Sequence, residues 1–323
     1  MAPGARAQSA GAGVPSLGRM AYQLSWIKNF QFAGEYIADH RGYYRKFGLE
    51  GVDLLAGGPN TIVDAVVMSG KALVGQSSPD FMSHAIAHGA PLKSIGACYQ
   101  KNSTGIISMA NTPLRTPKDL IGKRIGLQII NTVEWRSFLK FNQIDPSQVT
   151  TVPVQFEFSP LITGEVDGFF GDINDDSVEL EATGHKVHSL LFADFGYKMF
   201  GMVYSVRADS LEDSASRARL VAFMKGEVLG WQDEIKYPDV AADLTVNVYG
   251  KDNGLDLAVQ KACCIATNDF IVSPDTDKHG LFWMTDKAIE ETIVSLRASG
   301  VHISADLFTN KILEEVYASG IPI

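Results

Sequence analysis

Short apolar runs alternate with amphipathic stretches along the chain from Ala21 onwards, a pattern typical of βα repeats and mostly parallel sheets. In the first repeat, residues 22–25 predict a strand, and apolar residues at helical spacing follow until Gly48, a position typical of a left-handed helix cap. The same reasoning predicts two series of strands, at residues 22–25, 52–55, 72–74 and 92–97 and then at residues 105–109, 124–127, 152–154 and 166–170. We therefore predict an α/β protein with two doubly wound lobes.

After a strand at residues 202–206 the pattern becomes helical, with helices predicted at residues 214–237, 238–249, 255–269, 286–297 and 305–318. These helices need an apolar surface to cover, and the economical arrangement returns them to the first lobe. The chain then crosses between the lobes twice, near Thr104 and near Ser205, which predicts a two-strand hinge. The predicted division is a flexible N-terminal tether at residues 1–19, a discontinuous lobe one at residues 20–104 plus 206–323, and lobe two at residues 105–205.

Composition narrows the classes of partner. The 323 residues carry a formal net charge of −9 and contain no basic stripe, so we expect no nucleic-acid partner. No apolar run reaches the roughly 18 residues that a membrane-spanning helix needs. The three cysteines, two of them adjacent, give neither a disulfide framework nor a thiolate metal spacing.

The N-terminal residues 1–19 are rich in Ala, Gly and Ser and lack the apolar core of a secretory signal. Two explanations fit this segment. The chain is either a mature exported domain whose signal was replaced by Met1, or a cytosolic protein with a loose N-terminus.

Common catalytic and metal motifs are absent from the sequence. His84 and His88 have helical i, i+4 spacing, but no third ligand completes a zinc site. Pro117 and Arg124 stand where a phosphate-binding loop needs glycine and a hydroxyl residue, and no Gly-x-Ser-x-Gly elbow occurs. We therefore predict no metal, no cofactor and no catalytic residue.

Aromatic and hydrogen-bonding residues gather where the predicted strands end, beginning with Trp26 in the first loop. Ligands of open α/β sheets bind beyond the carboxyl ends of strands, and aromatic faces with amide or carboxyl groups suit a flat ring with polar edges. We therefore predict a planar heteroaromatic ligand between the lobes, although ordinary core packing stays open for any single aromatic residue. The predicted binding residues are Trp26, Asn29, Phe30, Gln31, Phe32, Asn60, Gln76, Ser77, Ser78, Tyr99, Asn131, Thr132, Trp135, Asp172, Asn174, Asp175 and Tyr197. Lys101 and the helix start at Asn131 are candidates for holding a phosphate on that ligand.

One stretch, WIKNFQFAGEYIA at residues 26–38, resembles in order and spacing the opening of the thiamine-pyrimidine-synthesis-like family of periplasmic solute-binding proteins. The resemblance continues at residues 57–60, 116–126 and 164–168. It implies a periplasmic-binding-protein-like type II fold and an extracytoplasmic, monomeric subunit that delivers its ligand to the membrane subunits of an ABC importer. Members of this family bind riboflavin or thiamine pyrimidine precursors, and related proteins bind alkyl sulfonates or nitrate, so a sulfonate- or nitrate-type binding protein is an alternative.

The same resemblance implies residue roles. Trp26 would stack on the ligand ring, Asn29 and Gln31 would donate to its edge, and Asp175 would accept from ring N–H groups. The loop around Gln31 is more similar to the riboflavin branch, because the pyrimidine branch more often has histidine there and glutamate at the position of Asp175.

An enzyme alternative comes from fungal relatives of this fold, which make the pyrimidine phosphate from pyridoxal phosphate with a lysine, a histidine and a cysteine-rich iron motif. The lysine and histidine would fall near Ser77 and Phe81, and no cysteine cluster occurs. The sequence therefore favours a binding protein over this enzyme.

Overall fold

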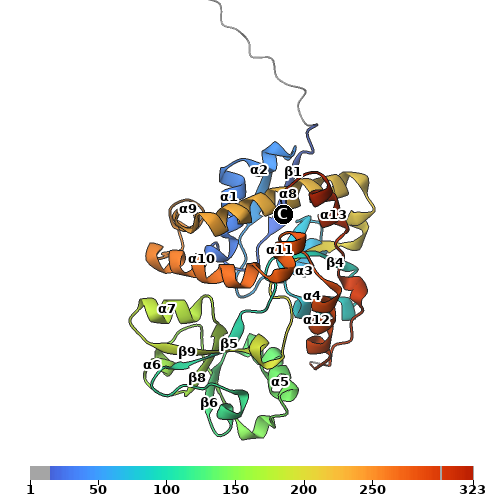
Figure 1. Cartoon of the computed structure of the whole chain (residues 1–323). Helices are drawn as coiled ribbons and strands as arrows, with labels where there is room; N and C mark the ends of the chain where they lie inside the picture. The colour runs from blue at the N-terminus through green and yellow to red at the C-terminus, as the bar shows by residue number, and fades with distance from the viewer. Residues whose placement is uncertain (1–14, 299, 323) are drawn as a thin grey trace, which may run out of the picture.

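The computed structural model describes residues 15–298 and 300–322 and arranges them as two lobes, each built on a sheet for which five strands are described (Figure 1). The first sheet has the order β2-β1-β3-β10-β4 and the second the order β7-β6-β8-β5-β9. In each sheet one strand, β10 or β5, runs antiparallel to both of its neighbours, and the other pairs are parallel. The strands are β1 Arg19–Gln23, β2 Gly51–Leu55, β3 Val74–Ser77, β4 Leu92–Ala97, β5 Thr104–Met109, β6 Arg124–Leu127, β7 Thr150–Pro153, β8 Gly168–Asp172, β9 Val187–Leu191 and β10 Val203–Arg207.

Strand β9 was not predicted from the sequence. It pairs antiparallel with β5 at the edge of the second sheet, from Gly105 opposite Leu191 to Met109 opposite Val187. The polar residues His188 and Ser189 interrupt its apolar run. An edge strand with one solvated side tolerates such residues.

Helices cover both sheets, and the C-terminal helices pack on lobe one (Figure 1). Those of lobe one are α1 Ala33–His40, α2 Tyr43–Lys46, α3 Val63–Met68, α4 Pro79–Ala87, α8 Ser214–Lys236, α9 Pro238–Leu244, α10 Leu257–Ile271, α11 Pro274–His279, α12 Asp286–Ala298 and α13 Lys311–Ala318. Lobe two has α5 Thr132–Phe141, α6 Ser159–Ile162 and α7 Asp176–Ala182. Short 3-10 turns include η1 Phe30–Phe32, directly before α1. Helix α11 was not predicted from the sequence.

The closest helix contact in lobe one joins α1 to α8. A Cβ atom on Gly34 would lie 2.3 Å from the ring of Trp231, and one on Gly230 would lie 2.2 Å from the carbonyl oxygen of Gly34. Both positions therefore require glycine for the backbones to approach this closely. Part of the family-like stretch at residues 26–38 is thus explained by packing.

The chain passes between the sheets through two segments, residues 98–103 and residues 192–202. They lie side by side: the N–H of Tyr99 donates to the carbonyl of Met202 (3.2 Å), and the N–H of Asn102 donates to that of Met199 (2.8 Å). The predicted boundary at residues 205/206 falls inside β10, which belongs to the first sheet from Val203 onwards.

The predicted tether lies mostly outside the described residues. Of its C-terminal part, Leu17 donates its N–H to the carbonyl of Gly48 (2.8 Å), and Arg19 opens β1. Among residues 15–298 and 300–322, no helix combines the length and the apolar character needed to cross a membrane.

Candidate functional site

One aromatic pair joins the two lobes. Trp26 follows β1 in lobe one, Phe156 follows β7 in lobe two, and their ring centroids are 5.7 Å apart with the planes tilted by 56°. Trp26 is half-buried, and the side chain of Phe156 is 56% exposed. Phe156 was not among the predicted residues, although it lies beyond the carboxyl end of a strand, as Trp26 does.

Two neighbouring rings predicted to face the ligand are core residues instead. Phe30 and Phe32 are fully buried in the hydrophobic core of lobe one. The N–H of Phe30 donates to the side chain of Gln260 on α10 (2.9 Å), which holds η1 against that helix. The expectation that these rings are open to a ligand is therefore wrong.

Three further predicted aromatics also belong to the cores. Tyr99 is buried in lobe one, and Trp135 and Tyr197 are buried in lobe two. Trp135 packs 6.4 Å from Phe192, and Tyr197 packs edge-on against Phe138 at 6.2 Å. Lobe two is small, and its few large rings are used to fill its interior.

The polar groups beside Trp26 have mixed roles. Asn29 accepts the N–H of Gln31 (3.1 Å) and caps η1, so this contact is structural. Gln76, at the end of β3, is fully buried, and its Oε1 accepts from the hydroxyl of Ser25 (3.2 Å). Among the described residues, the Gln76 Nε2 group and the Gln31 Oε1 atom have no hydrogen-bond partner.

The other predicted hydroxyl and amide residues make local contacts. Ser77 donates to Asp64 (2.8 Å), and Ser78 donates to Asp80. Asn131 donates to Gln128 (3.0 Å) and Thr132 to the carbonyl of Ile129 (2.7 Å), while Asn60 is an exposed residue three positions before α3. None of these hydrogen bonds joins the two lobes.

Polar residues after β8 do connect lobe two to lobe one. Asp172 accepts from the hydroxyl of Ser103 in the first crossover segment (2.6 Å), and Asn174 donates to Thr267 on α10 (2.8 Å). The carboxyl group of Asp175 lies 3.9 Å from the Cys263 sulfur on the same helix. Burial, with the negative charges of Asp172 and Glu179, raises the pKa of Asp175 to about 7. The structure therefore brings three of the predicted residues, Asp172, Asn174 and Asp175, to the junction of the lobes.

Glu134 on α5 is a junction residue that the sequence did not predict. Its Oε1 atom accepts from Asn102 (2.6 Å) and from the hydroxyl of Thr104 (2.5 Å). Burial, followed by the charge of Asp80 on α4, raises the pKa of Glu134 to about 8. Its place one residue before Trp135, in the first turn of a helix, was the available signal.

Comparison with known proteins identifies the family. Residues 29–241 match the profile described as NMT1/THI5 like, which is more than half of the chain. The chain belongs to the NMT1/THI5-like family.

Proteins similar to this NMT1/THI5-like chain include both binding proteins and enzymes. The riboflavin-binding protein RibY of Chloroflexus aurantiacus is 26% identical over 302 residues, covering 89% of this chain and 82% of RibY. The 4-amino-5-hydroxymethyl-2-methylpyrimidine phosphate synthase of Schizosaccharomyces pombe is 27% identical but covers only 51% of this chain and 48% of the synthase. The alkanesulfonate-binding protein SsuA of Xanthomonas axonopodis, solved with bound MOPS, has a TM-score of 0.62 at 15% identity, covering 92% and 97% of the two chains. The fold is thus the expected type II periplasmic-binding-protein fold.

The lysine and the histidine expected of a synthase are not found at the matching positions of this NMT1/THI5-like chain. Ser77 donates its hydroxyl to the carboxyl group of Asp64, and the ring of Phe81 is exposed. All three cysteines are free and buried, and burial raises the pKa of Cys98 and Cys264 far above its ordinary value. Across the described residues, no group of three or more His, Cys, Asp or Glu side chains is arranged to hold a metal ion.

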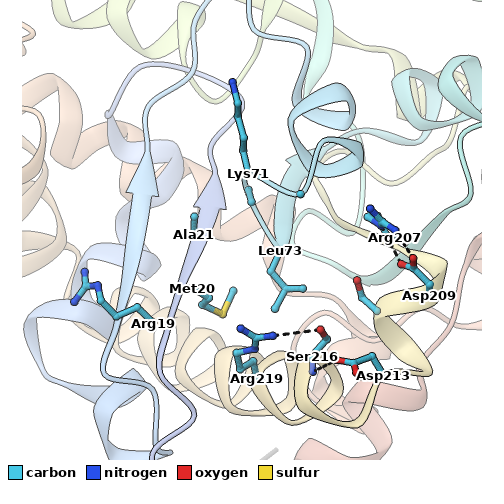
Figure 2. Close-up of a pocket in the computed structure, with 13 residues that line it drawn as sticks. Arg19, Met20, Ala21, Lys71, Leu73, Arg207, Asp209, Asp213, Ser216 and Arg219 are labelled. Atoms are coloured by element: carbon cyan, nitrogen blue, oxygen red, sulfur yellow. Dashed lines mark hydrogen bonds and ion pairs between the residues drawn. The ribbon is translucent and has the colours of Figure 1, made fainter.

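A separate cavity of about 490 Å³ lies at the opposite end of lobe one, at the amino ends of β1 and β3 (Figure 2). Arg219 points into it beside Met20 and Leu73, and Arg207 is held by Asp209 at its rim. None of the predicted binding residues lines this cavity.

Proposed function

We propose that this chain is the extracytoplasmic solute-binding subunit of an ABC importer and that it binds a planar heteroaromatic ligand, of the riboflavin or thiamine-pyrimidine class, between its two lobes. The observation that carries the proposal is the Trp26–Phe156 pair, because it places one aromatic face from each lobe at the same point. A flat ring that displaces this direct contact and enters between the two side chains would gain stacking contacts with both lobes. The near full-length relation to RibY supports the riboflavin class.

Groups that would read the ring edge lie at the end of β3 and on the lobe-two side of the junction. The unpartnered Gln76 Nε2 group belongs to a side chain that already contacts Ser25, next to Trp26, and it would donate to a ring carbonyl. The carboxyl groups of Asp175 and Glu134 stand on the lobe-two side, where they would accept ring N–H groups. A buried donor or acceptor without a partner is costly, so a ligand that supplies partners is favoured.

A ligand favours the closed arrangement of the lobes only if it contacts both of them. A ligand shifts an equilibrium between open and closed lobes only if it binds the closed state more tightly. In this structure the lobes meet on one side through Asn174 and Thr267, and on the other α12 packs against α5. A ring between Trp26 and Phe156 adds a third contact that only the closed arrangement provides.

The test is a fluorescence titration of the purified chain with riboflavin and, separately, with 4-amino-5-hydroxymethyl-2-methylpyrimidine. We expect saturable quenching at micromolar ligand or below, and at least tenfold weaker binding for Trp26→Ala and for Phe156→Ala. Tyr237→Ala, which removes a ring 39% exposed at the end of α8, is the matched control and should bind normally. Absence of saturable binding by either compound would refute the proposal.

The synthase-like alternative makes a different prediction. Its chemistry needs a lysine aldimine with pyridoxal phosphate, which has its own absorbance band. Addition of pyridoxal phosphate to the purified chain should leave the spectrum equal to the sum of the two components. A new band that borohydride removes would instead favour the enzyme.

A further inference from the structure

Carboxyl groups from both lobes gather where the lobes meet. Asp172 and Asp175 lie at the end of β8 and the start of α7, and Glu134 lies on α5. Lobe one contributes Asp80, in the first turn of α4. All four residues are half-buried. Asp80 and Asp172 are both close enough to Glu134 for their charges to act on it.

These carboxyl groups lack cationic partners. Within the described part of the chain, none of the nine ion pairs includes any of the four. The cation considered from the sequence, Lys101 in the first crossover segment, lies over the ring of Phe270 at 4.9 Å. Their side-chain hydrogen bonds come from neutral groups: Ser103, Asn102, Thr104, Ser78 and the Cys263 thiol.

The electrostatic consequence follows from Coulomb's law. Burial and neighbouring negative charge already raise the pKa of Glu134 to about 8 and that of Asp175 to about 7, so further negative charge at this place is unfavourable. A phosphate or sulfonate entering the junction would meet Asp172 and Asp80 without a cation to offset the repulsion. A neutral ring would find hydrogen-bond acceptors on this side, and the unpartnered Gln76 Nε2 donor on the other.

We propose that the interlobe site rejects anionic ligands, so that it accepts riboflavin or the free aminopyrimidine but excludes their phosphate esters, sulfonates and nitrate. This inference rests on the proposed function. It adds the charge class of the ligand, and it separates this chain from SsuA, whose name specifies an alkanesulfonate.

The experiment compares each neutral compound with its phosphate ester: riboflavin with riboflavin 5′-phosphate, and 4-amino-5-hydroxymethyl-2-methylpyrimidine with its phosphate. Affinities are measured by titration calorimetry at pH 7.5 and 0.15 M salt, with MOPS and nitrate as further probes. For the neutral compound that binds, we expect the phosphate ester to bind at least tenfold more weakly, and MOPS and nitrate not to compete.

Isosteric neutralisation identifies the carboxyl groups responsible. The double variant Asp80→Asn with Asp172→Asn removes the two charges named above, keeps the side-chain shapes and should reduce the discrimination against the phosphate ester by at least threefold. Asp80→Asn alone is the fallback if the double variant unfolds, which circular dichroism will show. Glu212→Gln makes the same charge change at an exposed position beyond β10 and should leave the discrimination unchanged.

The possible outcomes separate the two proposals. Equal affinity for riboflavin and its phosphate overturns the charge inference and leaves the proposed function intact. Tight binding of the phosphate that is lost in Lys101→Met overturns it as well and assigns Lys101 as an anion partner. Failure of both neutral compounds to bind refutes the proposed function, and the charge inference with it.

Discussion

The substitution Glu234→Gln tests how lobe one tolerates buried acids. Glu35, Glu227 and Glu234 are all fully buried in lobe one, and among the described residues none of them forms an ion pair. Glu227 accepts from the phenol groups of Tyr204 (2.9 Å) and Tyr44, and Glu35 accepts from Tyr22 (3.3 Å). Burial raises the pKa of Glu234 from 4.5 to about 8, and the Cys264 thiol opposes this only in part.

The sign of the effect follows from proton linkage. Between about pH 4.5 and pH 8 the folded protein keeps the Glu234 proton, whereas the unfolded chain has lost it. The stabilisation is therefore fully present below pH 4.5 and is lost as the pH rises towards 8. At about 1.4 kcal/mol per pKa unit, the shift corresponds to about 5 kcal/mol in the free energy of unfolding. This free energy is comparable with the whole stability of many domains.

Urea denaturation at pH 5, 6, 7 and 8, followed by far-UV circular dichroism, measures this difference. At pH 5 the wild type and Glu234→Gln should differ by less than about 1 kcal/mol, because the folded side chain is neutral in both and pH 5 lies only about half a unit above the pKa of the unfolded carboxyl group. At pH 8 the variant should be more stable by about 2 kcal/mol or more, toward the linkage figure. Glu212→Gln, at an exposed position, is the control. A difference between wild type and variant that does not change from pH 5 to pH 8 would refute the reasoning.

Three further predictions concern the motif around residue 30. Phe32→Ala should lower the free energy of unfolding by about 3–5 kcal/mol, measured by urea denaturation; an unchanged stability with weakened riboflavin binding would restore the ligand-facing hypothesis. Gly34→Ala should destabilise by about 1–3 kcal/mol through overpacking against Trp231, whereas Gly58→Ala, with nothing within 4 Å of the new Cβ, should not change the thermal midpoint by a comparable amount. Trp26→Ala should leave the midpoint of the unliganded protein nearly unchanged, and a large drop would show that this ring is part of the core.

The sequence predicted the division into two lobes because periodicity and glycine caps are local signals. Gly48, Gly70, Gly89 and Gly184 end helical segments where expected, and all four have positive φ. The return of the C-terminal helices to lobe one was also predictable, since long amphipathic helices need an apolar partner. Strand β9 was missed because its partner β5 lies far away in sequence, and pairing with it is a tertiary effect.

The candidate site was less predictable for a physical reason. Sequence position at a strand end does not tell whether a ring points to the ligand or beneath the sheet. Phe30 and Phe32 belong to a 3-10 turn whose contacts with α10 come from more than 200 residues away, as the Phe30–Gln260 hydrogen bond shows. Phe156 and Glu134 satisfied the same positional rule as Trp26 and Asp175, but they lacked a family resemblance to select them.

The paired crossover segments separate two properties of the protein. Main-chain hydrogen bonds between them, such as Tyr99 to Met202, do not depend on side-chain identity, so the pairing of the two crossover segments is set by the backbone. Ligand recognition depends instead on side chains that follow the strands. Under the proposed function, substitutions at positions such as Trp26, Phe156 and Asp175 would change which ligand is bound while leaving the main-chain connection between the lobes unaltered.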